Sequence, residues 1–279
     1  MTTSLTLPVV PDRGDGVWDY ISASRLNLWL KCPLAYKFRY IDGIRTPTTP
    51  SLFIGKRTHD ALEMFYRHRQ LGVQLSAEQL TGRIGSTWDE AAAADGMTFE
   101  SADDAAAAKQ QVVRLVETYL EHVPHDEPMP LTVETSLEAP LVDPVTGEDL
   151  GIKLLGIVDL VLDRQDGPVI CDFKTAANSS PPLELAHEIQ LTCYAYLLHQ
   201  ATGLRESSLE IRSLIKTKTP QVAFHAFEPR KPRHFRRLFA VIQAYLDDLD
   251  QQRFIYRPGW TCGMCEFSEN LCRTSVFAN

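Results

Sequence analysis

The sequence predicts an α/β fold, with a helical first half followed by a core of three strands, a helix and a further strand. Helical apolar spacing recurs in the first half, at about 22–40, 51–70, 76–94 and 102–123. Strand patterns follow, at about 131–142, 152–163 and 168–174. Next come a helix at 183–200, strand patterns near 208–216 and 221–227, and a long helix at about 231–252. This order gives an αβββαβ core with a helical insertion at about 71–127 and a cysteine-bearing tail at 258–279.

Length and composition favour a single globular domain over residues 21–279, after an N-terminal extension at 1–20. With 279 residues, 44% of them hydrophobic and 23% charged, the chain can bury a sizeable core. The first residues, Met1 to Asp19, lack the basic start and apolar core of a signal peptide, and no apolar run reaches the length of a membrane span. We therefore expect a cytoplasmic protein with no membrane partner.

The net charge of −8 is unusual for a protein that handles nucleic acid, so the distribution of charge matters more than its sum. Residues 78–127 hold eleven acidic against three basic residues, and this difference equals the net charge of the whole chain. Residues 21–70 hold nine basic against three acidic residues, a local charge of +6. Basic residues that could follow a phosphate backbone are Lys31, Lys37, Arg39, Lys56 and Arg57. Each of them is also typical of a solvated helix face.

The most informative segment carries Asp159 in one strand pattern and Asp172 and Lys174 in the next. Ionised groups in apolar strands are costly unless they pair or hold a metal. Because side chains alternate along a strand, Asp172 and Lys174 point to the same face. Two carboxylates suit a hard cation such as Mg²⁺, and a neighbouring ammonium suits a phosphate or a water, which indicates a metal-dependent phosphodiesterase. Asp-x-Lys by itself is also typical of a simple ion pair on a solvated strand.

Three further residues bear on this site. Gln190 and Tyr194 are four apart and share one face of their helix, where an amide and a hydroxyl suit a phosphate backbone or a metal-bound water. His59 lies on an amphipathic helix, four residues after Gly55, which permits close backbone approach. A lone His in that setting is also typical of packing or solvent exposure. Glu134, in the strand before Asp159, could assist the site, but a surface glutamate on an edge strand is the simpler interpretation and the one we expect.

The cysteines predict a second site. In a reducing compartment, clustered cysteines indicate metal binding rather than disulfides. Cys262, Cys265 and Cys272 lie within one short segment, and Cys32 is the natural fourth ligand. Zinc and an iron-sulfur cluster both accept four thiolates, and spacing alone does not choose between them. The remaining two, Cys171 and Cys193, fall in an apolar strand and a packed helix, where we expect them to act as small hydrophobes.

Together these residues resemble the PD-(D/E)xK nuclease superfamily, in the branch of RecB-type exonucleases that includes Cas4 and the AddB nuclease domain. That branch carries a His in a Gly-x-x-x-His helix, an Asp after a Gly-containing strand, an Asp/Glu-x-Lys strand and a Gln-x-x-x-Tyr helix. Matching residues occur here in the same order, at Gly55 and His59, Gly156 and Asp159, Asp172 and Lys174, and Gln190 and Tyr194. The resemblance covers roughly residues 20–274, including an opening helix at 22–40.

The resemblance implies a restriction-endonuclease-like fold and a set of roles for these residues. Mg²⁺ or Mn²⁺ would be held by His59, Asp159, Asp172 and the backbone carbonyl of Phe173. Lys174 would position or activate the attacking water, and Gln190 and Tyr194 would orient that water or a phosphate oxygen. In Cas4 and AddB relatives one N-terminal and three C-terminal cysteines hold a [4Fe-4S] cluster. The resemblance therefore favours a cluster over zinc at Cys32, Cys262, Cys265 and Cys272, where it would staple the tail to the first helix.

The implied function is a metal-dependent DNA exonuclease acting on single strands or duplex ends, in repair, recombination or CRISPR spacer processing. The chain lacks a Walker-type phosphate loop, so a helicase or CRISPR adaptation proteins would be separate partners. Two other interpretations stay open. One is a non-catalytic DNA-binding scaffold subunit of a nuclease-helicase or CRISPR adaptation complex. The other is a zinc-stapled hydrolase of some other phosphodiester.

Overall fold

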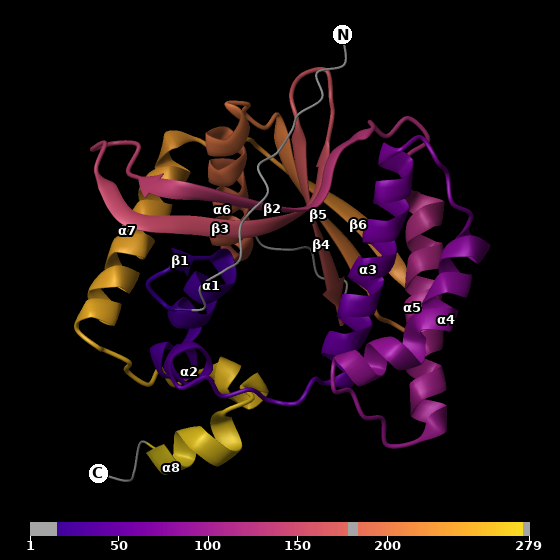
Figure 1. Ribbon diagram of the computed structural model, residues 1–279, viewed down its shortest axis with the longest axis horizontal. Helices are drawn as coiled ribbons and strands as arrows, with labels where there is room; N and C mark the ends of the chain where they lie inside the picture. The colour runs from indigo at the N-terminus through magenta and orange to yellow at the C-terminus, as the bar shows by residue number, and fades with distance from the viewer. Residues whose placement is uncertain (1–15, 178–183, 276–279) are drawn as a thin grey trace.

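The computed structural model describes residues 16–177 and 184–275 and has three layers, a mixed sheet with helices on both faces (Figure 1). The first helical layer consists of α1 (Ala23–Lys31), α6 (Glu184–Thr202) and α7 (Pro232–Asp250). The second consists of α3 (Pro50–Gln70), α4 (Ala77–Ala94) and α5 (Ala102–His122). Each layer packs its own buried cluster against the sheet. The predicted α/β class is therefore confirmed.

The sheet has six strands, in the order β1-β3-β4-β5-β6, with β2 on the free edge of β3. Their bounds are β1 Tyr20–Ile21, β2 Pro130–Val142, β3 Asp149–Leu162, β4 Val169–Ala176, β5 Ser208–Ile215 and β6 Gln221–Phe227. Antiparallel pairing joins β2, β3 and β4 in sequence. Strands β4 and β5 run parallel, and α6 makes the crossover that parallel strands require. The predicted αβββαβ order is thus present and is followed by β6, as predicted near 221–227; the short β1 was not predicted.

The ladder between β3 and β4 is short, and its end fixes the position of the site. Only three residue pairs join these strands, and the last of them is Leu160 with Cys171. In the same register, Asp159 and Asp172 come next and face each other just beyond the ladder. Strand β4 continues alongside β5 as far as Ala176. Two acidic residues therefore meet where one strand leaves its neighbour.

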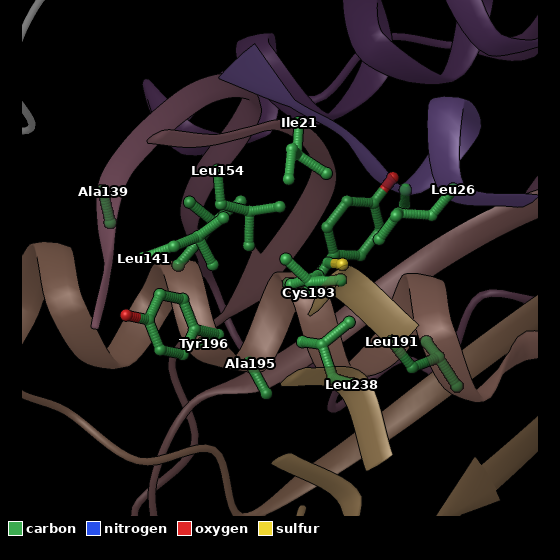
Figure 2. Close-up of a cluster of buried hydrophobic side chains, with 14 of the residues drawn as sticks. Ile21, Leu26, Ala139, Leu141, Leu154, Leu191, Cys193, Ala195, Tyr196 and Leu238 are labelled. Atoms are coloured by element: carbon green, nitrogen blue, oxygen red, sulfur yellow. The ribbon is translucent and has the colours of Figure 1, made fainter. Parts of the chain in front are cut away.

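In the first helical layer, α6 and α7 pack on one face of the sheet. Cys193 and Leu238, from these two helices, pack with Ile21, Leu26 and Leu154 in one buried cluster (Figure 2). The Cys193 thiol is 1% exposed and burial raises its pKa to about 12, so it remains a neutral thiol. The expected small-hydrophobe role of Cys193 is confirmed. Cys171, on β4, is fully buried in the second layer in the same way.

The second layer is held by a buried polar group as well as by apolar packing. Arg212 on β5 donates through Nη1 to Glu127 Oε1 at 2.6 Å and to the hydroxyls of Tyr66 and Tyr119, each at 2.8 Å. Its Nη2 also donates to Glu210 Oε2 at 3.0 Å. These contacts satisfy a buried guanidinium that would otherwise be costly. They tie α3 and α5 to the sheet, and so fix the place from which α3 reaches the site.

The start of the chain departs from the predicted single helix at 22–40. Helix α1 ends at Lys31, and α2 (Pro33–Tyr36) and η1 (Lys37–Ile41) follow after a break. Cys32 between them is extended, with φ −165° and ψ 111°, because a residue before proline is disfavoured in the helical region. The side chain of Cys32 thereby leaves the helical path. Tyr20 lies in β1, inside the predicted N-terminal extension; residues 1–15 of that extension fall outside the described part.

The end of the chain forms short turns rather than a long element. After α7 come η2 (Trp260–Met264), η3 (Ser268–Cys272) and α8 (Arg273–Ser275). A small cluster of Ala35, Phe38 and Phe267 buries this tail against α2 and η1. The linker predicted after Lys174 lies partly outside the described residues, at 178–183. Within the described ranges no helix combines the length and the apolar character that crossing a bilayer requires.

Candidate active site

Two charged residues of β4 form the centre of the candidate site. Lys174 Nζ lies 2.5 Å from Asp172 Oδ2, as expected for side chains two apart on a strand. Asp172 is 1% exposed, so the carboxylate is almost out of water. Burial raises the pKa of Asp172, and the charge of Lys174 opposes that rise. A solvated surface ion pair, the simpler interpretation of this motif, is excluded by this burial.

Asp159 meets Asp172 from β3, at the end of their shared ladder. Its Oδ2 accepts a hydrogen bond of 2.8 Å from the backbone N–H of Phe173. Burial raises the pKa of Asp159 to about 6, while the hydrogen bond from Phe173 and the charge of Lys174 lower it. Two acidic residues predicted from separate strand patterns are thus brought together by the sheet.

His59 reaches the same place from the other side, on α3. Its Nδ1 lies 3.8 Å from Asp159 Oδ2. A Cβ on Gly55 would lie 2.9 Å from Thr175 Oγ1, so a glycine lets α3 approach the end of β4 this closely. Burial, then the charge of Lys174, lowers the pKa of His59. The imidazole is therefore neutral near pH 7, the form in which it binds cations.

Helix α6 covers the site from the first layer. Gln190 Nε2 donates to Asp172 Oδ1 at 2.9 Å and to the Tyr194 hydroxyl at 2.8 Å. A Cβ on Gly156 would lie only 2.7 Å from Leu197 Cδ1, so this position of β3 needs a glycine for α6 to pack here. Gln190 therefore contacts the acidic centre directly, and Tyr194 is joined to it through the Gln190 amide.

Glu134 corrects one expectation. It lies on the edge strand β2 as predicted, but it is half-buried and offers a carboxylate oxygen within 4.8 Å of ligand atoms of both His59 and Asp159. Burial, then the charge of Asp159, raises its pKa to about 7. The expected surface role was wrong because strand periodicity does not reveal which residue of β3 lies opposite Glu134. The sequence gives no distinct signal for it, because the same strand also holds Glu138.

A cavity of about 480 Å³ adjoins the site on the α3 side. Lys56 and Lys216 line it together with acidic residues of α3 and with Glu134. Lys216 was missed by sequence analysis because it belongs to no motif and comes to the site only through the end of β5. His187, on α6, was missed for the same reason; burial, then the charge of Lys174, lowers its pKa.

The donor set fits a divalent cation. Carboxylate oxygens from two strands and an imidazole nitrogen lie within 4.8 Å of one another, in the group His59, Glu134 and Asp159. Asp172 adds a nearly buried carboxylate from β4. The Phe173 ring packs edge-on against the His59 ring, with centroids 5.9 Å apart, which places this residue beside the same atoms. Hard cations such as Mg²⁺ and Mn²⁺ favour ligands of this kind.

Most of the basic residues predicted to contact nucleic acid are paired within the protein. Lys37 Nζ lies 2.7 Å from Asp42, and Arg39 pairs with Glu266 of the tail. On α3, Lys56 pairs with Asp95, and Arg57 Nη2 lies 2.6 Å from Asp60 and 3.6 Å from Asp95. The acidic insertion therefore neutralises part of the basic helix. Lys31 is exposed and has no ion pair with a described residue.

The four predicted cysteine ligands gather at a separate place, between the first helices and the tail. A cavity of about 1160 Å³ is lined by Cys32, Cys262, Cys265 and Cys272. Burial raises the pKa of the Cys272 thiol, and the other three sulfurs, as neighbouring acidic groups, raise it further. Leu34 N–H donates to the Ile255 carbonyl at 3.3 Å, which joins the two segments. The fold thus brings Cys32 to three cysteines that lie far from it in sequence.

Comparison with known proteins agrees with this geometry. The family model described as the PD-(D/E)XK nuclease superfamily matches residues 20–273. The chain belongs to this superfamily. The nuclease aligns over 94% of its length with 94% of a crystal structure of a candidate exonuclease from Eubacterium rectale, at 10% identity and a TM-score of 0.53, which supports the fold. The structure of SSO0001 aligns over 67% of this chain and 78% of its own, at 16% identity and a TM-score of 0.37, too low to support an argument. No curated protein matches.

Proposed function

We propose that this nuclease is a metal-dependent DNA exonuclease. The observation that carries the proposal is the convergence of Asp159, Asp172 and Lys174 at the end of the β3–β4 ladder, with Asp172 Oδ2 2.5 Å from Lys174 Nζ. Carboxylates at this spacing from an ammonium suit the hydrolysis of a phosphodiester, in which negative charge develops on the phosphate. The proposed setting is repair, recombination or CRISPR spacer processing, with a helicase or CRISPR adaptation proteins as separate partners.

His59, Asp159, Asp172 and the Phe173 carbonyl would hold Mg²⁺ or Mn²⁺. When bound, such a cation polarises the scissile phosphate and lowers the pKa of water. The neutral imidazole of His59 is ready to act as a ligand, because its pKa lies below the usual value. The peptide of Phe173 is fixed by its N–H, which donates to Asp159. These residues would thereby hold the cation close to the ammonium of Lys174.

Lys174 would position the attacking water and offset charge in the transition state. Its partner Asp172 fixes the ammonium, and Gln190 in turn fixes Asp172 by donating to Oδ1 at 2.9 Å. The Tyr194 hydroxyl accepts from the same amide, which leaves its proton free for a phosphate oxygen or for the water. Helix α6 would thereby orient the reacting groups from one side, while α3 supplies the metal ligand from the other.

An assay on end-labelled DNA tests this function. Linear and covalently closed circular single-stranded DNA, and linear duplex DNA, would be incubated with the full-length protein and Mn²⁺. We expect degradation of the linear substrates alone, and none with Lys174→Ala. Cleavage of the circular DNA would mean that the protein is an endonuclease rather than an exonuclease. Binding of DNA without cleavage under any metal condition would favour the non-catalytic scaffold instead.

At the second site we propose a [4Fe-4S] cluster held by Cys32, Cys262, Cys265 and Cys272. The four cysteines line one cavity between the first helices and the tail, which supports a shared metal centre. Zinc and an iron-sulfur cluster both accept four thiolates. The resemblance to Cas4 and AddB relatives favours the cluster.

Anaerobically purified protein tests this second site. We expect absorbance near about 400 nm, as for an iron-sulfur centre, and its loss in Cys272→Ala. Cys193→Ala is the matched control, because Cys193 is a buried cysteine of the first layer and should leave the iron content unchanged. Colourless protein containing one zinc per chain would assign the four cysteines to zinc.

A further inference from the structure

We propose that Glu134 is a ligand of the divalent cation. Together with His59 and Asp159 it forms the group of three possible ligands whose donor atoms lie closest to one another at the site. The sequence favoured a surface position for Glu134. None of the superfamily motifs that match this chain includes it. The inference rests on the proposed metal-dependent function and adds a residue to it. Three independent observations support it: the position of Glu134 in the sheet, its backbone conformation, and the partners of the acids around it.

The position of Glu134 follows from the β2–β3 register. Val133 faces Leu160 and Thr135 faces Val158, so Glu134 lies opposite Asp159. The oxygens of Glu134 and Asp159 and a nitrogen of His59 lie within 4.8 Å of one another. Within the described residues, no other set of three His, Cys, Asp or Glu side chains meets this spacing.

The backbone of Glu134 is in an unusual conformation. Its φ is +42°, in the left-handed region that residues with a Cβ rarely adopt. Neighbouring contacts hold it there, since the Thr135 hydroxyl donates to the Val133 carbonyl at 3.2 Å and Arg67 Nη2 approaches the Glu134 carbonyl at 3.5 Å. Such strain costs about 1–3 kcal/mol and gathers at functional sites. Here it occurs at the one residue of β2 whose carboxylate lies beside His59 and Asp159.

The partners of the neighbouring acids single out Glu134. Asp60 and Glu63 line the same cavity, but each has an arginine partner, at 2.6 Å from Arg57 and 2.6 Å from Arg67 respectively. The Glu134 carboxylate has no ion pair with a described residue. A half-buried carboxylate facing another is unfavourable unless a cation joins them.

The two neighbouring carboxylates of the site differ in how far they are already engaged. Asp172 is already engaged by Lys174 and by Gln190. Glu134 has no such partner and is therefore the carboxylate most available to the ion.

Binding of Mn²⁺ to the full-length protein tests the inference without relying on activity. Free Mn²⁺ would be measured by electron paramagnetic resonance during titration of the wild type, Glu134→Gln and Glu63→Gln. Because even a residue that only supports a metal ligand is worth about 10–100-fold in affinity, we expect Glu134→Gln to raise the Kd at least tenfold. Glu63→Gln removes a charge from the same cavity and should change the Kd less than about twofold.

Two results would overturn the inference. One is wild-type affinity in Glu134→Gln, and the other is an equal loss in Glu63→Gln, which would mean that only the general field of the cavity matters. Asp159→Asn separates this inference from the proposed function. If Asp159→Asn loses Mn²⁺ while Glu134→Gln does not, only the role of Glu134 fails. If Asp159→Asn binds like the wild type, the proposed metal site itself fails.

Glu134→Gly tests whether the strained backbone of Glu134 is linked to its role as a metal ligand. Glycine adopts a positive φ without a steric penalty, so we expect this variant to have a higher Tm than the wild type in EDTA. It should also lose most of the rise in Tm that Mn²⁺ gives the wild type. A Tm gain from Mn²⁺ equal to that of the wild type would contradict the assignment.

Discussion

Asp159 Oδ2 accepts a hydrogen bond of 2.8 Å from the backbone N–H of Phe173. This contact joins β3 to β4 one step beyond the last pair of their ladder, Leu160 with Cys171. The Asp159 carboxylate thus accepts a hydrogen bond that a backbone carbonyl of β3 would accept if the ladder continued. The same carboxylate faces His59 at 3.8 Å. Asp159 is therefore both part of the sheet and part of the site, and both roles favour its ionised form while burial opposes it.

Asp159→Asn should therefore raise the stability of the metal-free protein at pH 8, whereas Asp159→Ala should not. Asparagine keeps an oxygen that accepts from Phe173 N–H and removes a buried charge, but alanine leaves that N–H without a partner, which costs about 1–3 kcal/mol. Urea unfolding in EDTA would measure the difference. An alanine variant as stable as the asparagine variant would show that the hydrogen bond contributes nothing.

Lys174→Met should lower the cleavage rate by at least about 100-fold, the usual contribution of a positioned proton-transfer or charge-stabilising group. Methionine retains the length of the side chain but not the ammonium that lies 2.5 Å from Asp172. Single-turnover cleavage with saturating Mn²⁺ is the measurement. Lys216→Met, in the adjoining cavity, is the matched control and should reduce the rate less than about tenfold. Equal losses in the two variants would assign the effect to the general positive field.

The stability of the metal-free protein should fall between about pH 4 and pH 6 through Asp159. Its pKa is raised from 3.8 to about 6 in the folded protein. The folded state therefore holds a proton that the unfolded state releases, and this stabilisation is fully present below pH 4 and lost as the pH rises through 6. Thermal unfolding in EDTA, compared with Asp159→Asn, isolates the contribution. A pH profile unchanged by the substitution would contradict the raised pKa.

The same linkage predicts how Mn²⁺ acts at different pH values. At pH 8 both Asp159 and Glu134 are ionised, because their pKa values are about 6 and about 7. A bound cation then offsets buried negative charge. At pH 5 both carboxyls are largely protonated and compete with the cation. Saturating Mn²⁺ should therefore raise the Tm more at pH 8 than at pH 5, and an equal rise at both pH values would argue against these ligands.

Arg212→Met should destabilise the protein by about 3–5 kcal/mol, because it leaves buried acidic groups without their partner. Arg212 Nη1 lies 2.6 Å from Glu127, and its Nη2 lies 3.0 Å from Glu210. Urea unfolding would measure the loss. Arg233→Met, at an exposed position of α7, is the control and should stay within about 0.5 kcal/mol of the wild type. A comparable loss of stability in both variants would mean that the buried network does not contribute the proposed stabilisation.

Local patterns were sufficient to place most helices. The helices predicted at 51–70, 76–94 and 102–123 correspond to α3, α4 and α5 within one residue at each end. Their first turns begin after Thr49, Ser76 and Ser101, whose side chains cap them. Capping and apolar spacing act over a few residues, so they can be recognised in the chain itself.

Long-range contacts could not be predicted in this way. The ion pairs of Lys56 and Arg57 with Asp95 join α3 to the end of α4, and no pattern in either helix indicates them. The same holds for β1, which has only two residues and is defined by its pairing with β3. Such contacts depend on how separate elements pack, which neither helical nor strand periodicity contains.

The sequence by itself determined the type and order of the elements and the shared face of Asp172 and Lys174, because these follow from periods of a few residues along the backbone. Only the tertiary structure placed Glu134 opposite Asp159 and brought His59 to both. That placement comes from the β2–β3 register and from the packing of α3 on the sheet, and a register is a relation between two strands that neither strand encodes alone.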